Sequence, residues 1–214
     1  MQQRMKFFLN QFYHVCNKSI SNYSIFRKEF FIQRFLNVID YYNTTEVVQN
    51  FGKIKRYKKL ELPGLLNNAN GERIVDVYAY CVMPDHYHLL FKVIEPDCVI
   101  NFISKIQNSY TRFYNLQNKR KGPLWQSRYR VTMVDSEKQL LHVSRYIHLN
   151  PTTAKLVAKP EEWPYSSYSL YLKPETLKEK TAICISSLGQ YRNFVEGNID
   201  YQQKLKEIKK LLLE

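Results

Sequence analysis

The chain has 214 residues, of which 44% are apolar, and its 32 Lys and Arg outnumber 19 Asp and Glu, giving a formal net charge of +13. The apolar share is typical of a globular protein and argues against disorder. No apolar run is long enough to span a bilayer, and the first residues lack the sustained apolar stretch of a secretory signal. We therefore expect a cytoplasmic protein of one domain with an extension.

Charge and cysteine usage narrow the class of protein further. A basic excess of this size favours a phosphate-rich partner, although a merely basic surface explains it equally well. Seventeen tyrosines and two tryptophans offer flat faces on which single-stranded bases can stack. The four cysteines are scattered without a CxxC pair, which argues against a structural zinc cage and a disulfide framework.

The first half of the chain predicts a strand, a helix and a β-hairpin. Period-2 alternation indicates a strand at 10–17, and apolar residues at helical spacing predict a helix at 27–42. Val, Ile and Tyr mark a strand at 72–83, and the turn signal Pro-Asp separates it from a returning strand at 86–93. Strand, helix and hairpin in this order open a split β-α-β pattern.

The second half completes the pattern and adds helices. An apolar stripe predicts a helix at 97–117, and clean alternation predicts a strand at 128–134. Ser136 and Gln139 form a capping-box pattern that starts a helix, which we expect to end before Pro151. We predict an α+β, ferredoxin-like antiparallel sheet with helices on one face. The additional helix and a C-terminal amphipathic helix then lie outside that core, and we divide the chain at 172/173.

Two histidines in the stretch PDHYHLL are the first candidate site. His86 and His88 are two apart on a strand, so their side chains share a face and could bind one metal ion. Chance pairs are common in sheets, so packing is the more frequent explanation of such a pair taken alone. On the helix after Ser136, positions four apart place His142, Tyr146 and Asn150 on one stripe, and Asn150 offers an oxygen ligand near the helix C-terminus.

Several stretches in the same order resemble a known family. These are YCVMPDHYHLLF (80–91), LWQSRYR (124–130), SRYIHLNP (144–151) and WPYSSY (163–168), preceded by FYHVCNKS (12–19) and IFRKEF (25–30). Together they resemble the REP-associated tyrosine transposases, which are single-tyrosine HUH transposases. Joint matches over residues 10–172 are far more specific than one short motif.

The resemblance implies an enzyme with a tyrosine nucleophile and a metal ion. It implies that His86, His88 and Asn150 bind Mg²⁺ or Mn²⁺, and that Tyr146 attacks a phosphate of single-stranded DNA. The product would be a 5′-phosphotyrosine and a free 3′-hydroxyl. It further implies a hairpin-forming DNA partner at the bacterial nucleoid. A homodimer is compatible with this reading.

A basic stretch after the 97–117 helix is the expected DNA contact, because cations and aromatic rings occur together there. It comprises Lys119, Arg120, Lys121, Trp125, Arg128 and Arg130. A second basic run, Lys53, Lys55, Arg56, Lys58 and Lys59, is DNA contact or solvated surface with equal weight.

Three alternatives stay open at the level of sequence. A non-catalytic ferredoxin-like module could grip nucleic acid with aromatic residues, although an RRM signature is not visible. An HUH replication initiator or relaxase would use the same kind of site, with metal-binding histidines and a tyrosine nucleophile, on a different DNA substrate. Within the transposase reading, Tyr110 and Tyr114, four apart on a helix, could rival Tyr146 as nucleophile.

Overall fold

A computed structural model describes residues 6–46, 50–53, 72–126, 128–173 and 187–211 of the chain. Its centre is a four-stranded sheet in the order β2-β3-β1-β4, in which all neighbouring strands are antiparallel. The strands are β1 (Phe12–Lys18), β2 (Val75–Val82), β3 (His86–Val93) and β4 (Arg130–Val134). This order is the one that the split β-α-β pattern produces, so the predicted ferredoxin-like fold is confirmed.

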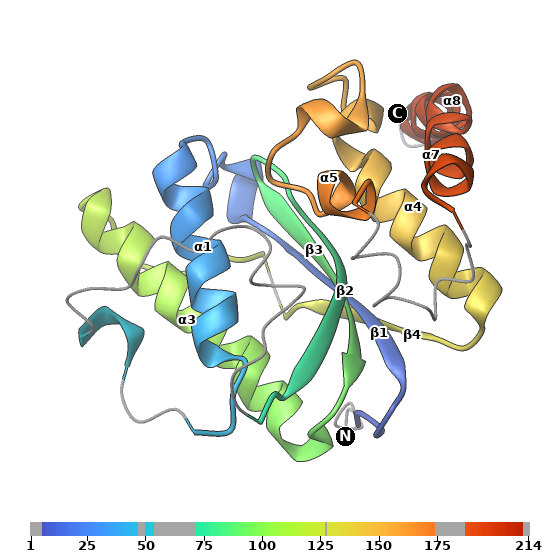
Figure 1. Cartoon of the computed structure of the whole chain (residues 1–214). Helices are drawn as coiled ribbons and strands as arrows, with labels where there is room; N and C mark the ends of the chain where they lie inside the picture. The colour runs from blue at the N-terminus through green and yellow to red at the C-terminus, as the bar shows by residue number, and fades with distance from the viewer. Residues whose placement is uncertain (1–5, 47–49, 54–71, 127, 174–186, 212–214) are drawn as a thin grey trace.

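Two long helices, α1 (Glu29–Tyr42) and α3 (Pro96–Gln117), cover one face of the sheet (Figure 1). Alternate residues of β1 and β3 point into this layer, where Phe35 of α1 packs on Tyr87 with ring centroids 4.8 Å apart. Gln107 of α3 donates a hydrogen bond to the Tyr87 hydroxyl (2.9 Å). Burial of aromatic and aliphatic side chains of α1 and α3 stabilises this layer.

The opposite face of the sheet is covered as well, by α4 (Glu137–Thr153) and α5 (Tyr168–Tyr171) (Figure 1). The additional helix predicted after Ser136 is therefore a second layer on the sheet. Ser167 joins this layer to β2, since its hydroxyl accepts a hydrogen bond from the Tyr80 N–H (2.9 Å). Such bonds occupy backbone groups that an edge strand would otherwise expose.

Helix α4 is longer than predicted, because it continues through Pro151 to Thr153. A proline removes one backbone hydrogen bond but does not prevent the turn that follows it. The last carbonyl groups find partners in the C-terminal part of the chain: Gln203 donates to the Thr152 carbonyl (2.9 Å) and Lys206 to that of Thr153 (3.4 Å). These contacts satisfy the acceptors that a helix end leaves open.

The C-terminal part forms two helices, α7 (Leu188–Glu196) and α8 (Ile199–Leu211), which lie against α4 (Figure 1). The sequence predicted only the second of them. Tyr191 of α7 is fully buried against α4, so the extension docks on the domain. Short 3-10 turns at Ile20–Asn22, Phe51–Lys53 and Pro160–Glu162 complete the described elements.

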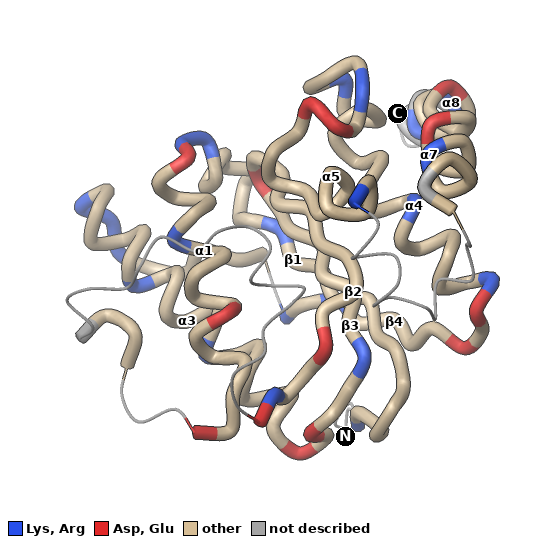
Figure 2. Tube along the Cα trace, in the orientation of Figure 1, with Lys and Arg blue, Asp and Glu red and all other residues tan. Residues whose placement is uncertain are grey.

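None of the described helices is long and apolar enough to cross a membrane. Charge is unevenly placed along the trace: Lys and Arg positions mark the tip of α3, and acidic positions gather at the lower end of the sheet (Figure 2). The basic run at 53–59 lies outside the part of the chain whose side chains are described.

Candidate active site

The sheet face beneath α4 carries a row of polar side chains from its two central strands. Cys16 of β1 lies opposite His88 of β3, and Lys18 lies opposite His86. Side chains opposite each other on neighbouring strands share a face. The histidine pair therefore faces α4, as its spacing predicted, and His14 of β1 joins it on the same face.

His88 is the buried member of the pair. Its Nδ1 lies 2.9 Å from Nε2 of His14, and its Nε2 is buried without a hydrogen-bond partner among the described residues. Burial, followed by the nearby charges of His14 and His86, holds the pKa of His88 well below its usual value. His88 is therefore neutral at pH 7, the form in which imidazole binds metal ions.

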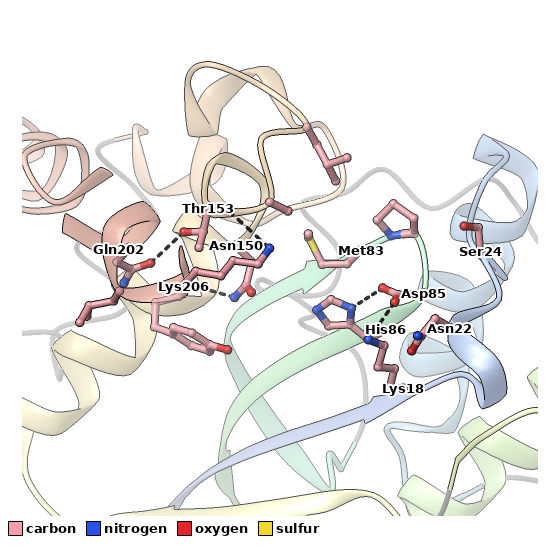
Figure 3. A pocket seen from close by; sticks show the side chains of 15 residues that line it. Lys18, Asn22, Ser24, Met83, Asp85, His86, Asn150, Thr153, Gln202 and Lys206 are labelled. Carbon is pink, nitrogen blue, oxygen red and sulfur yellow. Dashed lines mark hydrogen bonds and ion pairs between the residues drawn. The ribbon is translucent and has the colours of Figure 1, made fainter. Parts of the chain in front are cut away.

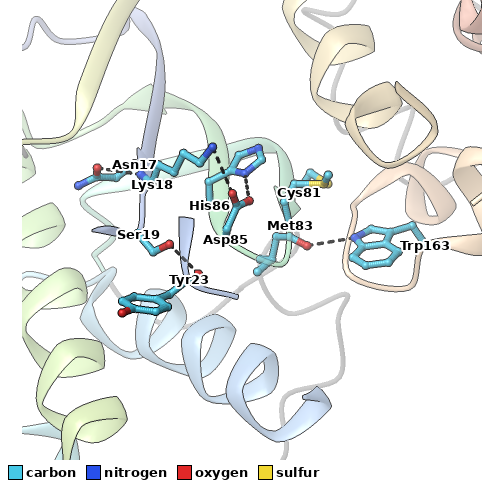
Figure 4. A network of polar contacts seen from close by, with 10 residues as sticks. Asn17, Lys18, Ser19, Tyr23, Cys81, Met83, Asp85, His86 and Trp163 are labelled. Carbon is cyan, nitrogen blue, oxygen red and sulfur yellow. Dashed lines mark hydrogen bonds and ion pairs between the residues drawn. The ribbon is translucent and has the colours of Figure 1, made fainter. Parts of the chain in front are cut away.

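His86 is held by a carboxylate. Its Nδ1 lies 2.5 Å from Oδ1 of Asp85, and Lys18 Nζ lies 3.2 Å from Oδ2 of the same group (Figure 4). Burial alone would raise the pKa of Asp85, but the hydrogen bonds and charges of His86 and Lys18 lower it. A charged Asp85 thus fixes the His86 ring and leaves Nε2 as its open nitrogen.

Tyr146 projects from α4 onto the histidines. Its ring stands edge-on to His88, with centroids 5.5 Å apart and planes at 86°, and edge-on to His14 at 6.2 Å. The side chain is 43% exposed, so a ligand can reach its hydroxyl. Burial raises the pKa of Tyr146, Cys16 adds to that rise, and a hydrogen bond from Asn150 opposes it. The phenol is protonated at neutral pH.

Asn150 follows Tyr146 by one helical turn. Its Nδ2 donates to the Tyr146 carbonyl oxygen (2.9 Å), which directs the amide oxygen away from the helix backbone. His86, Tyr146 and Asn150 line one pocket of about 630 Å³, together with Lys18 and, from α8, Lys206. In Figure 3 the Asp85–His86 pair and Asn150 lie on opposite sides of that pocket.

The donor set fits a divalent cation. In each of the two imidazoles the other ring nitrogen is engaged, and Nε2 of His88 is buried with no partner among the described residues, which is typical of a metal site. The amide oxygen of Asn150, across the same pocket from His86, is a ligand type that suits Mg²⁺ or Mn²⁺. A second group in the described residues, His14, Cys16 and His88, places its ligand atoms within 4.8 Å of one another. Burial raises the pKa of the Cys16 thiol, so that thiol is protonated at neutral pH while no ion is bound.

Other candidates from the sequence lie away from this group. Tyr110 is fully buried in the α1–α3 layer, and its hydroxyl donates to the Ile25 carbonyl (2.8 Å), so it cannot serve this pocket. Tyr114 packs in the same layer beside Phe31. His148 turns from the pocket and is buried between Ser167 Oγ (2.8 Å) and the Tyr191 hydroxyl (2.7 Å).

The basic stretch between Lys119 and Arg130 contains residues that contact the protein itself and residues whose side chains are exposed. Arg120 braces its own loop, since its guanidinium donates to Asn115 Oδ1 (2.8 Å) and the Pro123 carbonyl (2.5 Å). Trp125 is half-buried, and its ring packs on Phe26, Phe35 and Tyr87.

Other members of the stretch are placed to meet a ligand. Lys119, Lys121 and Arg128 have exposed side chains. Arg130 is exposed on β4 opposite Cys16, and thus on the histidine face. The loop closes against the pocket end of β1, where the Gln126 N–H donates to the Lys18 carbonyl (2.9 Å).

Sequence reasoning missed His14 and Asp85. Asp85 adjoins the pair in sequence but was interpreted as part of the turn. His14 lies more than seventy positions before His88, and only the register of β1 on β3 brings the two together. The alternation of FYHVCNK put His14 on the same face as Cys16, but nothing in the sequence fixed which face of β3 it would meet.

Comparisons with known proteins agree with this architecture. Residues 52–150 match the family described as "Transposase IS200 like". A Haemophilus influenzae protein described as "Putative REP-associated tyrosine transposase" is 30% identical over 116 residues, which are 49% of this chain and 65% of the relative. The "REP-associated tyrosine transposase" of Escherichia coli K12 is 27% identical over 100 residues, 45% of this chain and 56% of the relative. The chain thus spans less than two thirds of either relative.

A solved structure shares the fold. It is that of "the REP associates tyrosine transposase bound to a REP hairpin", with a TM-score of 0.58 at 14% identity over 82% of this chain and 87% of its own. The fold and the match over residues 52–150, which is less than half of the chain, make it similar to the class of IS200-like transposases. Within that class, the resemblance of this chain to the REP-associated tyrosine transposases is confirmed.

Proposed function

We propose that the chain is a metal-dependent, single-stranded DNA nuclease and strand transferase that acts beside a DNA hairpin. The observation that carries the proposal is the meeting of Tyr146, Asn150 and His86 at one pocket, with the Tyr146 ring edge-on to His88. A nucleophile, two imidazoles and an amide oxygen there combine the groups that phosphoryl transfer requires.

Tyr146 is the nucleophile in this proposal. Its hydroxyl oxygen attacks the phosphorus, the bond from phosphorus to the 3′-oxygen breaks, and the departing oxygen takes up a proton as a 3′-hydroxyl. The DNA then remains joined to the protein as a 5′-phosphotyrosine, and the ester keeps the energy needed for rejoining. Because burial raises the pKa of Tyr146, the phenol has to lose its proton as it attacks.

His86, His88 and Asn150 would hold the divalent cation. When bound, Mg²⁺ or Mn²⁺ would polarise the phosphate and offset the charge that develops on it. His86 is oriented by Asp85, and the buried, neutral His88 has an unpartnered nitrogen on the same face. The lining of one pocket by His86, Tyr146 and Asn150 of a single chain supports a site built within one chain.

The DNA would approach over the exposed end of the sheet. Arg130, Lys119, Lys121 and Arg128 supply positive charge around β4 and the loop before it, and Lys18 and Lys206 line the pocket itself. Contacts of this kind bind phosphates without regard to base sequence. The REP hairpin bound by the structurally similar protein makes a folded single strand the partner that we propose here, at the nucleoid.

Covalent capture of DNA tests the proposal. Incubation with hairpin-forming single-stranded oligonucleotides and Mn²⁺ is expected to give a protein–DNA adduct that resists denaturation. Tyr146→Phe is expected to abolish it, while Tyr201→Phe, an exposed tyrosine on α8, serves as the matched control. Metal-independent binding with no adduct from any oligonucleotide would instead favour a non-catalytic nucleic-acid-binding module.

A further inference from the structure

We propose that His14 is a positioning residue that accepts a hydrogen bond from Nδ1–H of His88 and thereby keeps His88 in its metal-binding tautomer. The inference rests on the proposed function, in which Nε2 of His88 is a ligand of the divalent cation. His14 lies outside residues 52–150, the stretch that the transposase family matches.

The geometry of the two rings is that of an in-plane hydrogen bond. Nε2 of His14 and Nδ1 of His88 are 2.9 Å apart, the ring planes differ by only 18°, and the centroids are 5.1 Å apart. The centroid separation exceeds the nitrogen separation by about one ring width, as expected when two rings meet edge to edge. An imidazole lone pair lies in the ring plane, so this arrangement aims a donor at an acceptor.

The proposed role of His88 as a ligand decides which ring donates, because its buried Nε2 has no partner among the described residues in either tautomer of the metal-free protein. A neutral imidazole has one N–H and one lone pair, so if His14 donates, the proton of His88 is on Nε2. If His88 donates from Nδ1, its Nε2 is instead a bare lone pair, which an arriving cation can use.

The second histidine of the pair shows the same arrangement. Nδ1 of His86 is engaged by the Asp85 carboxylate, just as Nδ1 of His88 is engaged by His14. Metal-binding histidines commonly donate their other N–H to a neighbouring acceptor, which fixes the tautomer and the ring orientation. Both rings thus have Nδ1 occupied and Nε2 available, which suits two ligands of one ion.

The register of β1 on β3 brings His14 close to His88. The residue directly opposite His88 on β1 is Cys16, so His14 is its diagonal neighbour on the same face. Diagonal neighbours in a sheet are close enough for long or aromatic side chains to meet. The ring of Tyr146 stands edge-on to both imidazoles, with its centroid 6.2 Å from that of His14 and 5.5 Å from that of His88.

A competing arrangement makes the proposal falsifiable. His14, Cys16 and His88 could together bind one soft metal ion. An ion there would need the Nδ1 lone pair of His88, so Nδ1 could not carry the proton that the proposal assigns to it. The two arrangements therefore predict opposite tautomers for His88.

The tautomer can be read directly in the full-length, metal-free protein. Long-range ¹H–¹⁵N correlation spectra of the imidazole rings, assigned with His88→Gln, are expected to show His88 protonated on Nδ1. A proton on Nε2 would overturn the proposal. This measurement does not depend on activity, so it remains valid even if the wild-type chain fails to bind Mn²⁺. That failure would contradict the proposed function and not the tautomer of His88.

Metal affinity supplies the second readout. Mn²⁺ titrations followed by electron paramagnetic resonance are expected to show about 10- to 100-fold weaker binding in His14→Phe. His14→Gln keeps an acceptor near the position of Nε2, and its affinity is expected to stay close to that of the wild type. His142→Phe, an exposed ring on α4, is the matched control and is expected to change nothing.

Three outcomes would contradict the proposal. Equal Mn²⁺ affinity in His14→Phe and the wild type would show that His14 does not position His88. Equal losses in His14→Phe and His14→Gln would show that an acceptor is not what matters. Co²⁺ spectra with a thiolate charge-transfer band that Cys16→Ser removes would place the ion on the competing cluster. Circular dichroism and thermal melting exclude misfolding as the source of any loss.

Discussion

At the scale of residues, sequence spacing predicts which side chains of the site share a face, but only the structure shows which hydrogen-bond partners they have. His86 and His88 share a face because they are two apart on a strand, and Tyr146 and Asn150 share one because they are four apart on a helix. The sequence alone supports both statements. Their partners Asp85 and His14 could not be assigned in the same way, since a hydrogen bond depends on rotamers and strand register.

Removing the Asp85 carboxylate is expected to weaken the site without unfolding the protein. In Asp85→Ala the His86 ring loses its acceptor and Lys18 loses its ion pair, so Mn²⁺ affinity should fall about 10- to 100-fold. Asp85→Asn keeps a neutral acceptor, so its Mn²⁺ affinity should lie between that of the wild type and that of Asp85→Ala. The matched control is Asp97→Ala on the first turn of α3, and the experiment is a Mn²⁺ titration. An unchanged affinity in Asp85→Ala would show that His86 needs no such support.

At the scale of elements, periodicity predicted the strands and long helices well because both faces of each are defined by burial. The hairpin strand at 86–93 follows from the Pro-Asp turn before it, and the order of the sheet follows from the split β-α-β order of the elements. The end of α4 was not predicted correctly, because Pro151 was interpreted as the end of the helix. The helix continues to Thr153, and side chains of α8 bind its last carbonyl groups. Long-range contacts of this kind leave no local signal.

The N-cap of α4 should contribute measurably to stability. Ser136 Oγ accepts a hydrogen bond from the Gln139 N–H (3.2 Å), so Ser136→Ala is expected to cost about 1 kcal/mol in the free energy of unfolding. For a chain of this size that corresponds to a drop in Tm of roughly 2–4 °C. Ser136→Asp retains a capping oxygen and should melt close to the wild type. A Ser136→Asp protein as unstable as Ser136→Ala would argue against capping as the cause.

His148 should make stability depend on pH, because it joins α4 to α5 and α7 while buried and neutral. Burial lowers its pKa to about 3 from an ordinary 6.5, so below pH 6.5 only the unfolded chain takes up its proton. Stability is thus complete above pH 6.5 and is lost as pH falls toward 3, by about 2 kcal/mol at pH 5.

Urea unfolding with chelator at pH 7, 6 and 5 measures this effect. His148→Gln cannot titrate at this position, so its free energy of unfolding should fall less steeply between pH 7 and 5 than that of the wild type. The variant is expected to be less stable at every pH, because it loses part of a buried hydrogen-bond network. Parallel pH curves for the two proteins would contradict the assignment.

At the scale of the whole molecule, a net charge of +13 predicted a phosphate-rich partner but not where that partner lies. The fold places the exposed Arg130 on the histidine face and turns Arg120 and Trp125 toward the protein itself. A basic stretch in a sequence therefore mixes residues that support a loop with residues whose side chains are exposed. Composition cannot separate the two, because the distinction is one of side-chain direction.

Salt dependence distinguishes the two kinds of residue. In Arg130→Ala the slope of log affinity against log salt concentration for a hairpin oligonucleotide should become shallower by about 0.7 to 0.9, the loss of one phosphate contact. Lys105→Ala on α3, whose ammonium lies 6.0 Å from the ring centre of Tyr42, is the control and should leave the slope unchanged. Identical slopes for Arg130→Ala and the wild type would remove Arg130 from the DNA path.

The central claim is that Tyr146 becomes covalently joined to DNA, and peptide mapping of the adduct tests it most directly. Cleavage after Arg145 and Lys155 releases the peptide YIHLNPTTAK, in which Tyr146 is the single tyrosine. After incubation with a single-stranded hairpin substrate and Mn²⁺, mass spectrometry is expected to find this peptide carrying a 5′-linked nucleotide. A nucleotide on any other tyrosine, or an adduct that persists in Tyr146→Phe, would contradict the account.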